Sequence, residues 1–379
     1  MCRHDCILLW EVVMGQVTLG SLFDGIGGFP YAASFYGVRT LWASEVMEDC
    51  ISATRRHFPE VCHTGDITKL HGGRLPPVDI ITFGSPCQGL SLAGKRRGFI
   101  DERSGLFLEA VRVIYEMKEA TDGKYPRFAL WENVPGALSS AGGRDFKAVL
   151  EALTESEVPM PHSGKWANAG MVRSGGADLA WCVYDAQYFG TAQRRRRVFL
   201  VTDFGGRCAG EILFDPKSLR GYFEAGGTPW QGISAFGGED AEKAGGGHDA
   251  DTGELTGWDI AEGDVYCIAG NTIGRKPENG GHGICCQQEL SYTLTTVDRH
   301  VVIAPVRAEG RGRIYAARRL TPLECERLQG FPDDWTRYRH DGRQIGDTRR
   351  YEMLGNSIAV PCAAYIMQGM CHVLKKDKE

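Results

Sequence analysis

One cysteine of this chain stands where a nucleophile is expected. Cys87 follows the apolar run 78–83, which is typical of a buried strand, and has Pro86 before it and Gln88-Gly89 after it. Proline and glycine on either side indicate a shaped, exposed loop, whereas most unpaired cysteines are packed in cores. A thiolate is a strong nucleophile when neighbouring positive charge lowers its pKa. We therefore predict that Cys87 attacks a substrate.

A carboxylate follows a second apolar run in the same manner. Glu132 comes directly after the expected strand 128–131 and precedes Asn133-Val134. The carboxyl ends of parallel strands lie along one edge of a sheet, so Glu132 and Cys87 are predicted to face one pocket. A thiol and an acid are together suited to covalent catalysis, with a proton or a hydrogen bond to stabilise the developing charge.

A glycine-rich turn follows the first expected strand, 17–22. Gly25, Gly27 and Gly28 allow the main chain to turn tightly beside a ligand. Glu45 stands 45 − 25 = 20 residues after Gly25, the spacing at which an acid holds a ribose hydroxyl in dinucleotide-binding folds. The spacing is G-x-G-G and not G-x-G-x-x-G, so an ordinary chain reversal remains an alternative.

An aspartate follows the next glycine and is open to two interpretations. Asp66, in Gly65-Asp66-Ile67, could accept a hydrogen bond from an adenine amino group. Aspartate at such a position is also a common cap or turn residue. Asp66 favours a nucleotide site only when it is considered together with the glycine turn.

Basic side chains cluster although the chain is acidic overall. Lysine and arginine number 43 and aspartate and glutamate 48, for a formal charge of −5. The run 194–197 is four consecutive arginines, 307–319 contains five, and Lys95, Arg96 and Arg97 lie close after the candidate nucleophile. Such clusters can follow a phosphate backbone, or they can be solvated surface.

Apolar runs alternate with helical patterns over the first two hundred residues. The expected strands are 17–22, 38–43, 78–83, 128–131 and 198–202, and the expected helices are 29–36, 48–58 and 104–118. This alternation predicts an α/β fold with a Rossmann-like, mostly parallel, doubly wound sheet. Ligands of such a sheet bind beyond the carboxyl ends of its strands, where the motifs above lie.

The alternation ends after Asp203. The Gly-rich region 204–313 is predicted to form a second, smaller domain, with short strands at 292–296 and 301–304. A helix is expected after Thr321, an N-cap followed by proline, and another over 358–374. The expected division of the chain is 1–16 as an extension, 17–203 as the first domain, 204–313 as the second, and 314–379 as a segment that returns to the first.

Composition excludes several classes of protein. No apolar run approaches the roughly 18 residues that a membrane span needs. The 13 cysteines are odd in number and include no C-x-x-C pair, which favours a reducing compartment, the cytoplasm, over a disulfide framework or a zinc site. We predict no metal.

Together, in this order, the motifs resemble those of the DNA cytosine-5 methyltransferase family of bacterial or phage type, over about 17–370. The elements that carry the resemblance are 23–28, Glu45, Asp66, Pro86-Cys87-Gln88, Glu132-Asn133-Val134, 193–197 (Q-x-R-x-R), 319–325 and Gly355-Asn356-Ser357. The region 204–313 corresponds to the variable part of the family, and Thr293-Leu294-Thr295-Thr296 is similar to its Thr-Leu segment. The resemblance implies that 17–203 is the catalytic domain and 204–313 the target-recognition domain.

The resemblance also implies a set of site residues. The catalytic ones are Cys87, Glu132, Arg195 and Arg197, with the two arginines serving the flipped base and nearby phosphates. The residues that hold the methyl donor are Phe23, Asp24, Gly25, Gly27, Gly28, Glu45, Asp66, Ile67, Pro86, Leu106, Asn356 and Ser357. The DNA contacts are Gln88, Ser91, Lys95, Arg96, Arg97, Thr293 and Thr295. The loop 88–103 is the expected lid, and the acidic stretch 236–264 is expected to point away from phosphates.

The implied reaction is transfer of a methyl group from S-adenosylmethionine to carbon 5 of a cytosine in a specific sequence of double-stranded DNA. The implied enzyme is a cytoplasmic monomer, either part of a restriction-modification system with a separate endonuclease or an orphan. Three alternatives remain open: an RNA cytosine-5 methyltransferase, a nucleotide-binding redox enzyme with a reactive thiol, and a DNA-binding protein without activity. The redox alternative leaves Glu132 and the arginine run unexplained.

Overall fold

The computed structural model describes residues 16–85, 102–214, 264–273, 285–308 and 312–377. The chain divides into two compact units: unit 1 is 1–184, 196–225 and 362–379, and unit 2 is 185–195 and 226–361. The bounds of these units differ from those of the expected domains, since 185–195 and 314–361 both belong to unit 2. The functional division into a catalytic domain (17–203) and a recognition domain (204–313) stays a prediction, and most of the acidic stretch lies outside the described residues.

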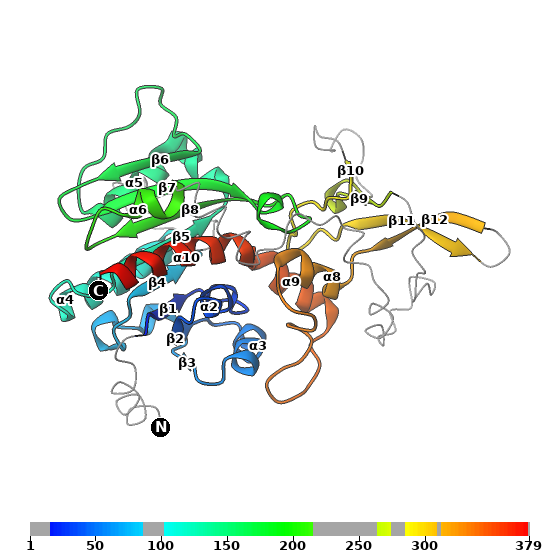
Figure 1. Cartoon of the computed structure of the whole chain (residues 1–379), viewed down its shortest axis with the longest axis horizontal. Helices are drawn as coiled ribbons and strands as arrows, with labels where there is room; N and C mark the ends of the chain where they lie inside the picture. The colour runs from blue at the N-terminus through cyan, green and yellow to red at the C-terminus, as the bar shows by residue number, and fades with distance from the viewer. Residues whose placement is uncertain (1–15, 86–101, 215–263, 274–284, 309–311, 378–379) are drawn as a thin grey trace. The chain divides into compact units, whose positions relative to one another are not determined.

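Unit 1 is built on an eight-stranded sheet with the order β3-β2-β1-β4-β5-β8-β7-β6 (Figure 1). The strands are β1 Thr18–Leu22, β2 Arg39–Ser44, β3 Cys62–His63, β4 Ile80–Phe83, β5 Phe128–Asn133, β6 Ala169–Arg173, β7 Asp178–Asp185 and β8 Arg196–Asp203. The five neighbouring strands β3-β2-β1-β4-β5 pair in parallel. Strand β8 runs antiparallel to β5, and β6 runs antiparallel to β7. The predicted α/β class with a mostly parallel sheet is confirmed.

Helices cover both faces of this sheet. They are α2 Gly28–Ser34, α3 Glu48–His57, α4 Glu102–Ala120, α5 Arg144–Thr154, α6 Ala209–Phe214 and α10 Val360–Lys376. Phe107 of α4 and Phe146 of α5 pack on Trp131 of β5, with ring centroids 5.8 and 6.3 Å away. On the opposite face, Tyr184 lies 5.8 Å from Tyr365 of α10, so this helix packs against β7. Burial of these large aromatic side chains contributes to the stability of the core.

The expected elements of unit 1 are confirmed to within a few residues at each end, but the sequence analysis missed the hairpin β6–β7 and helix α5. Strand β6, Ala-Gly-Met-Val-Arg, alternates between exposed and half-buried residues. Its apolar content is therefore too low to mark it as a buried strand. Strand β7 does carry an apolar run, at 179–184, which the sequence analysis did not use.

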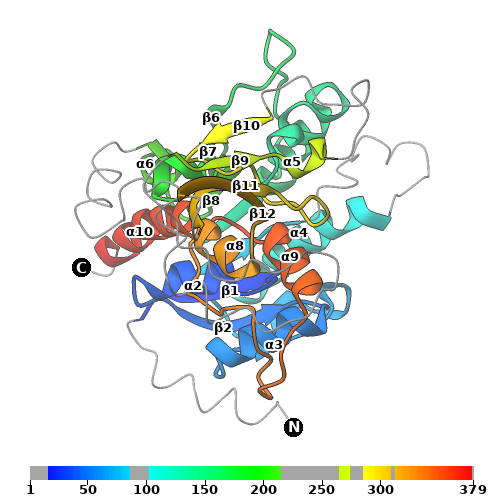
Figure 2. The same ribbon diagram turned by 90° about the vertical axis from the view of Figure 1, so that its right-hand side faces the viewer.

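Unit 2 contains a four-stranded antiparallel sheet, whose strands lie side by side in the order β10-β9-β11-β12 (Figure 2). The strands are β9 Tyr266–Ile268, β10 Cys286–Gln288, β11 Val301–Ala308 and β12 Gly312–Arg319. The strand predicted at 292–296 is wrong: only an isolated bridge forms, between Ser291 and Gln193. The amide of Leu294, which a neighbouring strand would bind, is instead taken by the Gln193 side chain.

Two helices follow in unit 2, α8 (Pro322–Gln329) and α9 (Asp347–Asn356). Helix α8 begins as predicted, because Thr321 accepts a hydrogen bond from the Glu324 amide and Glu324 accepts one from the Thr321 amide. This reciprocal capping box satisfies two donors that the helix cannot satisfy itself. The predicted helix near 358–374 is α10, which starts at Val360.

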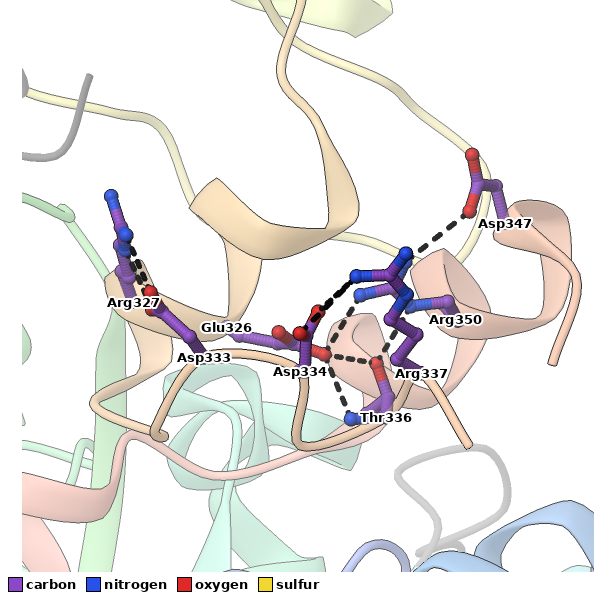
Figure 3. Close-up of polar contacts among 8 residues, drawn as sticks. All are labelled: Glu326, Arg327, Asp333, Asp334, Thr336, Arg337, Asp347 and Arg350. Atoms are coloured by element: carbon purple, nitrogen blue, oxygen red, sulfur yellow. Dashed lines mark hydrogen bonds and ion pairs between the residues drawn. The ribbon is translucent and has the colours of Figure 1, made fainter. Parts of the chain in front are cut away.

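A buried ion pair holds α9 against α8 (Figure 3). Arg350 of α9 donates to Oε1 of Glu326 at 3.1 Å, and the Thr336 amide donates to the same oxygen at 2.8 Å. The Arg350 Nε also donates to the Thr336 hydroxyl at 3.1 Å. These contacts fix the helix that ends in the Gly355-Asn356-Ser357 turn.

No single helix in the described ranges is long and apolar enough to cross a membrane, although α9 and α10, bent by 40° at the break between them, pass that test as a pair on length and composition alone. No group of three or more His, Cys, Asp and Glu among the described residues could hold a metal ion.

Candidate active site

The glycine turn after β1 adopts a conformation that few side chains tolerate. Gly25 and Gly27 have φ angles of 57° and 79°, and Phe23 shares the left-handed region at 54°. Glycine is the residue that takes up such angles without cost. The Gly25 amide donates to Oε2 of Glu45 at 2.8 Å, while Oε1 of Glu45 accepts from the amides of Val46 and Met47. The 20-residue spacing thus brings the predicted acid into contact with the predicted turn.

Asp24 lies beneath this turn and is buried, with 6% of its surface exposed. Its Oδ2 accepts from the Thr54 hydroxyl at 3.4 Å, and its buried Oδ1 has no hydrogen-bond partner among the described residues. Burial is the largest of the causes that raise the pKa of Asp24 to about 7, and the Glu45 carboxylate adds to it, against the hydroxyls of Ser21 and Thr54. A carboxyl in such surroundings loses its charge easily.

Asp66 caps a short turn that is anchored to α4. Its Oδ1 accepts from the amide and the hydroxyl of Thr68, at 3.0 and 2.9 Å, and these two bonds hold its pKa below the usual range. Asp66 is therefore a capping residue, and its contact with an adenine amino group stays a prediction. Arg112 of α4 fixes the turn by donating to the carbonyls of Ile67 and Leu70. Ile67 is buried, and Leu106 of α4 is half-buried against the core.

Glu132 and Arg197 form an ion pair at neighbouring strand ends. Arg197 Nε lies 3.1 Å from Oε1 of Glu132, and the side chains are 14% and 12% exposed. The two residues approach because β5 and β8 pair antiparallel, with Glu132 opposite Phe199. A charge-assisted contact of this kind fixes the orientation of the carboxylate. The sequence analysis predicted both as site residues but did not predict the contact between them.

The chain that leads to Cys87 passes beside this pair. A Cβ placed on Gly84 would stand 3.5 Å from Oε2 of Glu132. Ser85 is anchored on either side, because its hydroxyl accepts from the Trp131 indole at 3.2 Å and its carbonyl accepts from the Asn133 amide at 3.3 Å. The two residues before Pro86 are therefore held against the end of β5.

Several predicted site residues lie outside the described residues, and their geometry stays a prediction. They are Pro86, Cys87, Gln88, Ser91, Lys95, Arg96 and Arg97. The expected lid 88–103 falls almost wholly in the same range.

The remaining predicted residues belong to unit 2. Arg195 is 2% exposed, and its terminal nitrogens donate to the main-chain carbonyls of Leu294, Gly355 and Ser357. The side-chain nitrogens of Arg195, which were predicted to serve the flipped base and nearby phosphates, thus contact main-chain carbonyls in the structure. Asn356 is exposed and Ser357 buried.

The hydroxyls of both threonines predicted to contact DNA are engaged locally. Thr293 donates to the Arg194 carbonyl at 2.6 Å, and Thr295 accepts from the Asp298 amide at 2.8 Å. Sequence reasoning gave no role to Gln193 itself, which is fully buried and contacts Leu294 and Leu328. The only feature of the sequence that could have indicated a role for Gln193 is its position directly before the arginine run.

Comparison with known proteins gives relatives along nearly the whole chain. A DNA N-6-adenine-methyltransferase of Escherichia phage P1 is 28% identical over 97% of this chain and 62% of its own length. The type II methyltransferase M1.ScrFI of Lactococcus lactis subsp. cremoris is 29% identical over 94% of this chain and 79% of its own length. The crystal structure of the S. pombe Dnmt2 methyltransferase superposes with a TM-score of 0.56 at 14% identity, covering 95% of this chain and 99% of that one, which shows the fold alone.

The target named for the phage protein, adenine, belongs to that protein. The present chain matches the sequence model of a different description, C-5 cytosine-specific DNA methylase, over residues 17–203 and 271–372. That match covers the β1 turn, the loop of Cys87, the Glu132–Arg197 strand ends and the Gly355–Ser357 turn. The predicted enzyme class, DNA (cytosine-5-)-methyltransferase with S-adenosylmethionine as the methyl donor, is confirmed at the level of the family. The chain belongs to the C-5 cytosine-specific DNA methylase family.

Proposed function

We propose that this chain methylates carbon 5 of a flipped-out cytosine within a specific duplex DNA sequence, through a covalent adduct of Cys87. The observation that carries the proposal is the Glu132–Arg197 pair, which stands beside Gly84, three residues before Cys87. An acid oriented by an arginine next to the loop of a nucleophile is the arrangement that addition to an electron-poor ring requires.

The proposed roles follow from the charge that develops on the base. The Cys87 thiolate adds to carbon 6, and the electron pair of the 5,6 double bond moves toward carbon 5 and the ring. Glu132, hydrogen-bonded at ring nitrogen 3, stabilises the negative charge, and Arg197 holds the Glu132 carboxyl in place. Carbon 5 then takes the methyl group from the sulfonium, and S-adenosylhomocysteine leaves. A water molecule removes the carbon-5 proton, and the electron pair of that bond re-forms the 5,6 double bond and expels the Cys87 thiolate.

The donor fits the residues at the carboxyl ends of β1 and β2. S-adenosylmethionine supplies an electrophilic methyl group on a sulfonium centre. Glu45, beside the Gly25 amide, suits the ribose hydroxyls, and Asp66 suits an adenine amino group. The buried Oδ1 of Asp24, which lacks a partner in the described part of the chain, is a hydrogen-bond acceptor under the turn that would receive the donor. The turn 23–28, Ile67, Pro86, Leu106, Asn356 and Ser357 complete the proposed donor site.

The target cytosine is stacked inside the duplex and must be flipped out, at an unstacking cost of about a few kcal/mol. We assign closure over the base to the loop 88–103 with its basic residues, and reading of the sequence to 204–313. Cytoplasmic location, a monomeric state, independence from metal, and a separate restriction endonuclease also belong to the proposal.

An RNA substrate is the second candidate. The likeness to the Dnmt2 structure, at 14% identity, concerns the fold alone and does not decide between RNA and DNA as the substrate. The family description and the 110-residue recognition region expected between 204 and 313 favour duplex DNA.

Transfer of labelled methyl from S-adenosylmethionine to unmethylated duplex DNA, followed by base-resolved sequencing of 5-methylcytosine, tests the proposal. We expect methylation confined to one short sequence. Labelling of RNA alone would favour the second candidate, and absence of transfer would favour a binding protein without activity. The Cys87→Ser variant is expected to abolish transfer and keep donor binding, whereas an equal loss of donor affinity would contradict the placement of Cys87 at the base.

A further inference from the structure

Two segments of unit 2, one predicted to read the DNA target and one predicted to bind the methyl donor, have main chains in close contact. They are the target-reading segment Thr293–Thr296 and the donor turn Gly355–Ser357. A Cβ placed on Gly355 would lie 2.4 Å from the Thr295 carbonyl carbon and 2.6 Å from the Thr296 nitrogen. No side chain fits at such distances, so only glycine allows α9 to end against the target-reading segment.

One guanidinium joins the same two segments. Arg195 Nη1 donates to the Leu294 carbonyl at 3.0 Å, and Nη2 donates to the Gly355 carbonyl at 3.2 Å and to that of Ser357. The planar fork of arginine directs several donors at fixed angles, so the three carbonyls cannot shift independently. The Gly355 carbonyl is among the last four of α9, which lack partners within the helix and carry its negative end. A buried cation is stabilised there.

Two buried amides support this contact from the other side. Gln193 accepts from the Leu294 amide at 3.2 Å and donates to the Leu328 carbonyl at 3.0 Å. Gln329 donates to the Leu354 carbonyl at 2.8 Å. The target-reading segment, the end of α8 and the end of α9 therefore form one hydrogen-bonded unit around Arg195.

We propose that Arg195 is a positioning residue that sets the target-reading segment and the donor turn relative to each other, so that donor affinity and sequence discrimination depend on the same side chain. The inference rests on the proposed function, which assigns Thr293–Thr296 to DNA and Asn356-Ser357 to the donor. Because one side chain holds both segments in place, loosening the contact is expected to disturb both. Arg195 touches neither the base nor a phosphate in this assignment, unlike Arg197 beside Glu132.

The test compares two lysine variants of neighbouring arginines. Arg195→Lys keeps the charge but replaces the fork with a single ammonium, whereas Arg196→Lys changes an exposed side chain and is the matched control. Calorimetry measures the Kd of S-adenosylhomocysteine without DNA, and base-resolved sequencing measures the ratio of methylation at the preferred site to that at single-mismatch sites.

We expect Arg195→Lys to weaken product binding on the order of tenfold, equal to about 1.4 kcal/mol, and to lower the discrimination ratio as well. Arg196→Lys is expected to match the wild type in both. If Arg195→Lys binds the product and discriminates like the wild type, and loses only kcat, Arg195 acts on the base and the inference is overturned.

A second variant keeps the inference testable if Arg195→Lys does not fold. Gly355→Ala lies in the donor turn, yet its added Cβ would push against Thr295. We expect it to lower the discrimination ratio together with donor affinity, and unchanged discrimination would overturn the inference. The wild-type methylation assay decides the proposed function separately, because the calorimetric comparison requires no turnover.

Discussion

Two arginine–carboxylate pairs of this chain stand in contrasting surroundings. The Glu132–Arg197 pair of unit 1 lies at strand ends and keeps 12% and 14% of its side chains exposed. The Glu326–Arg350 pair of unit 2 is 0% and 7% exposed, and Thr336 adds two bonds to the same glutamate oxygen. The first pair remains reachable for a substrate, whereas the second is enclosed by the protein. In the proposed function the first pair takes part in the reaction, whereas the second pair positions a helix.

Breaking the enclosed pair gives the largest expected effect on stability. Arg350→Met leaves the Glu326 carboxylate buried without its cation, which costs about 3–5 kcal/mol of the free energy of unfolding. Urea unfolding measures this loss. The control is Arg349→Met, which removes an exposed pair with Glu352 and should cost less than about 1 kcal/mol. Similar losses in the two variants would show that enclosure does not distinguish the pairs.

Breaking the reachable pair is expected to affect rate and not stability. Glu132→Gln keeps the shape of the side chain but weakens stabilisation of charge at ring nitrogen 3, so single-turnover methyl transfer should slow by about 100-fold or more. The melting temperature should change little. Glu151→Gln on α5, which alters a partly exposed pair with Lys147, is the matched control and should keep the wild-type rate. A stability loss in Glu132→Gln as large as that of Arg350→Met would remove the contrast.

Asp24 sharpens the comparison, because it is a buried carboxyl that forms no ion pair with the residues that the structure describes. Its pKa is about 7 in the folded chain, against 3.8 as the ordinary value. The folded state therefore binds the proton more tightly than the unfolded state, and the stability contribution of Asp24 is full below about pH 4 and is lost as the pH rises to about 7. Asp24→Asn should abolish this fall, with a gain over wild type of at most a few kcal/mol near pH 8. Unfolding curves at pH 5 and pH 8 that shift equally in both proteins would contradict the assignment.

The smallest expected effect concerns the start of α8, the helix that carries Glu326. Thr321→Ala removes one half of the capping box and should cost about 1 kcal/mol. The measurement is the same urea unfolding. A loss near that of Arg350→Met would mean that the cap, and not the ion pair, fixes α8.

The sequence predicted most of unit 1 and the types of group in the site. The glycine turn with Glu45, the strand before Cys87 and the strand before Glu132 are each visible within a short window of residues. The start of α8 at Thr321 is equally local. Unit 2 was predicted less well: the strand expected at 292–296 does not form, since its hydrogen bonds go to the segment around Gln193.

Local pattern by itself determined which residue types stand at the strand ends, because strand and helix periodicity and turn chemistry act over a few residues. Only the tertiary structure decided what Arg195 contacts. Its acceptors lie 99, 160 and 162 residues away in the chain, at Leu294, Gly355 and Ser357. No periodicity spans such separations, and a main-chain carbonyl carries no signature in the sequence. Arg195 and Arg197, two residues apart in one motif, therefore read alike and are separated only by what the fold brings to each.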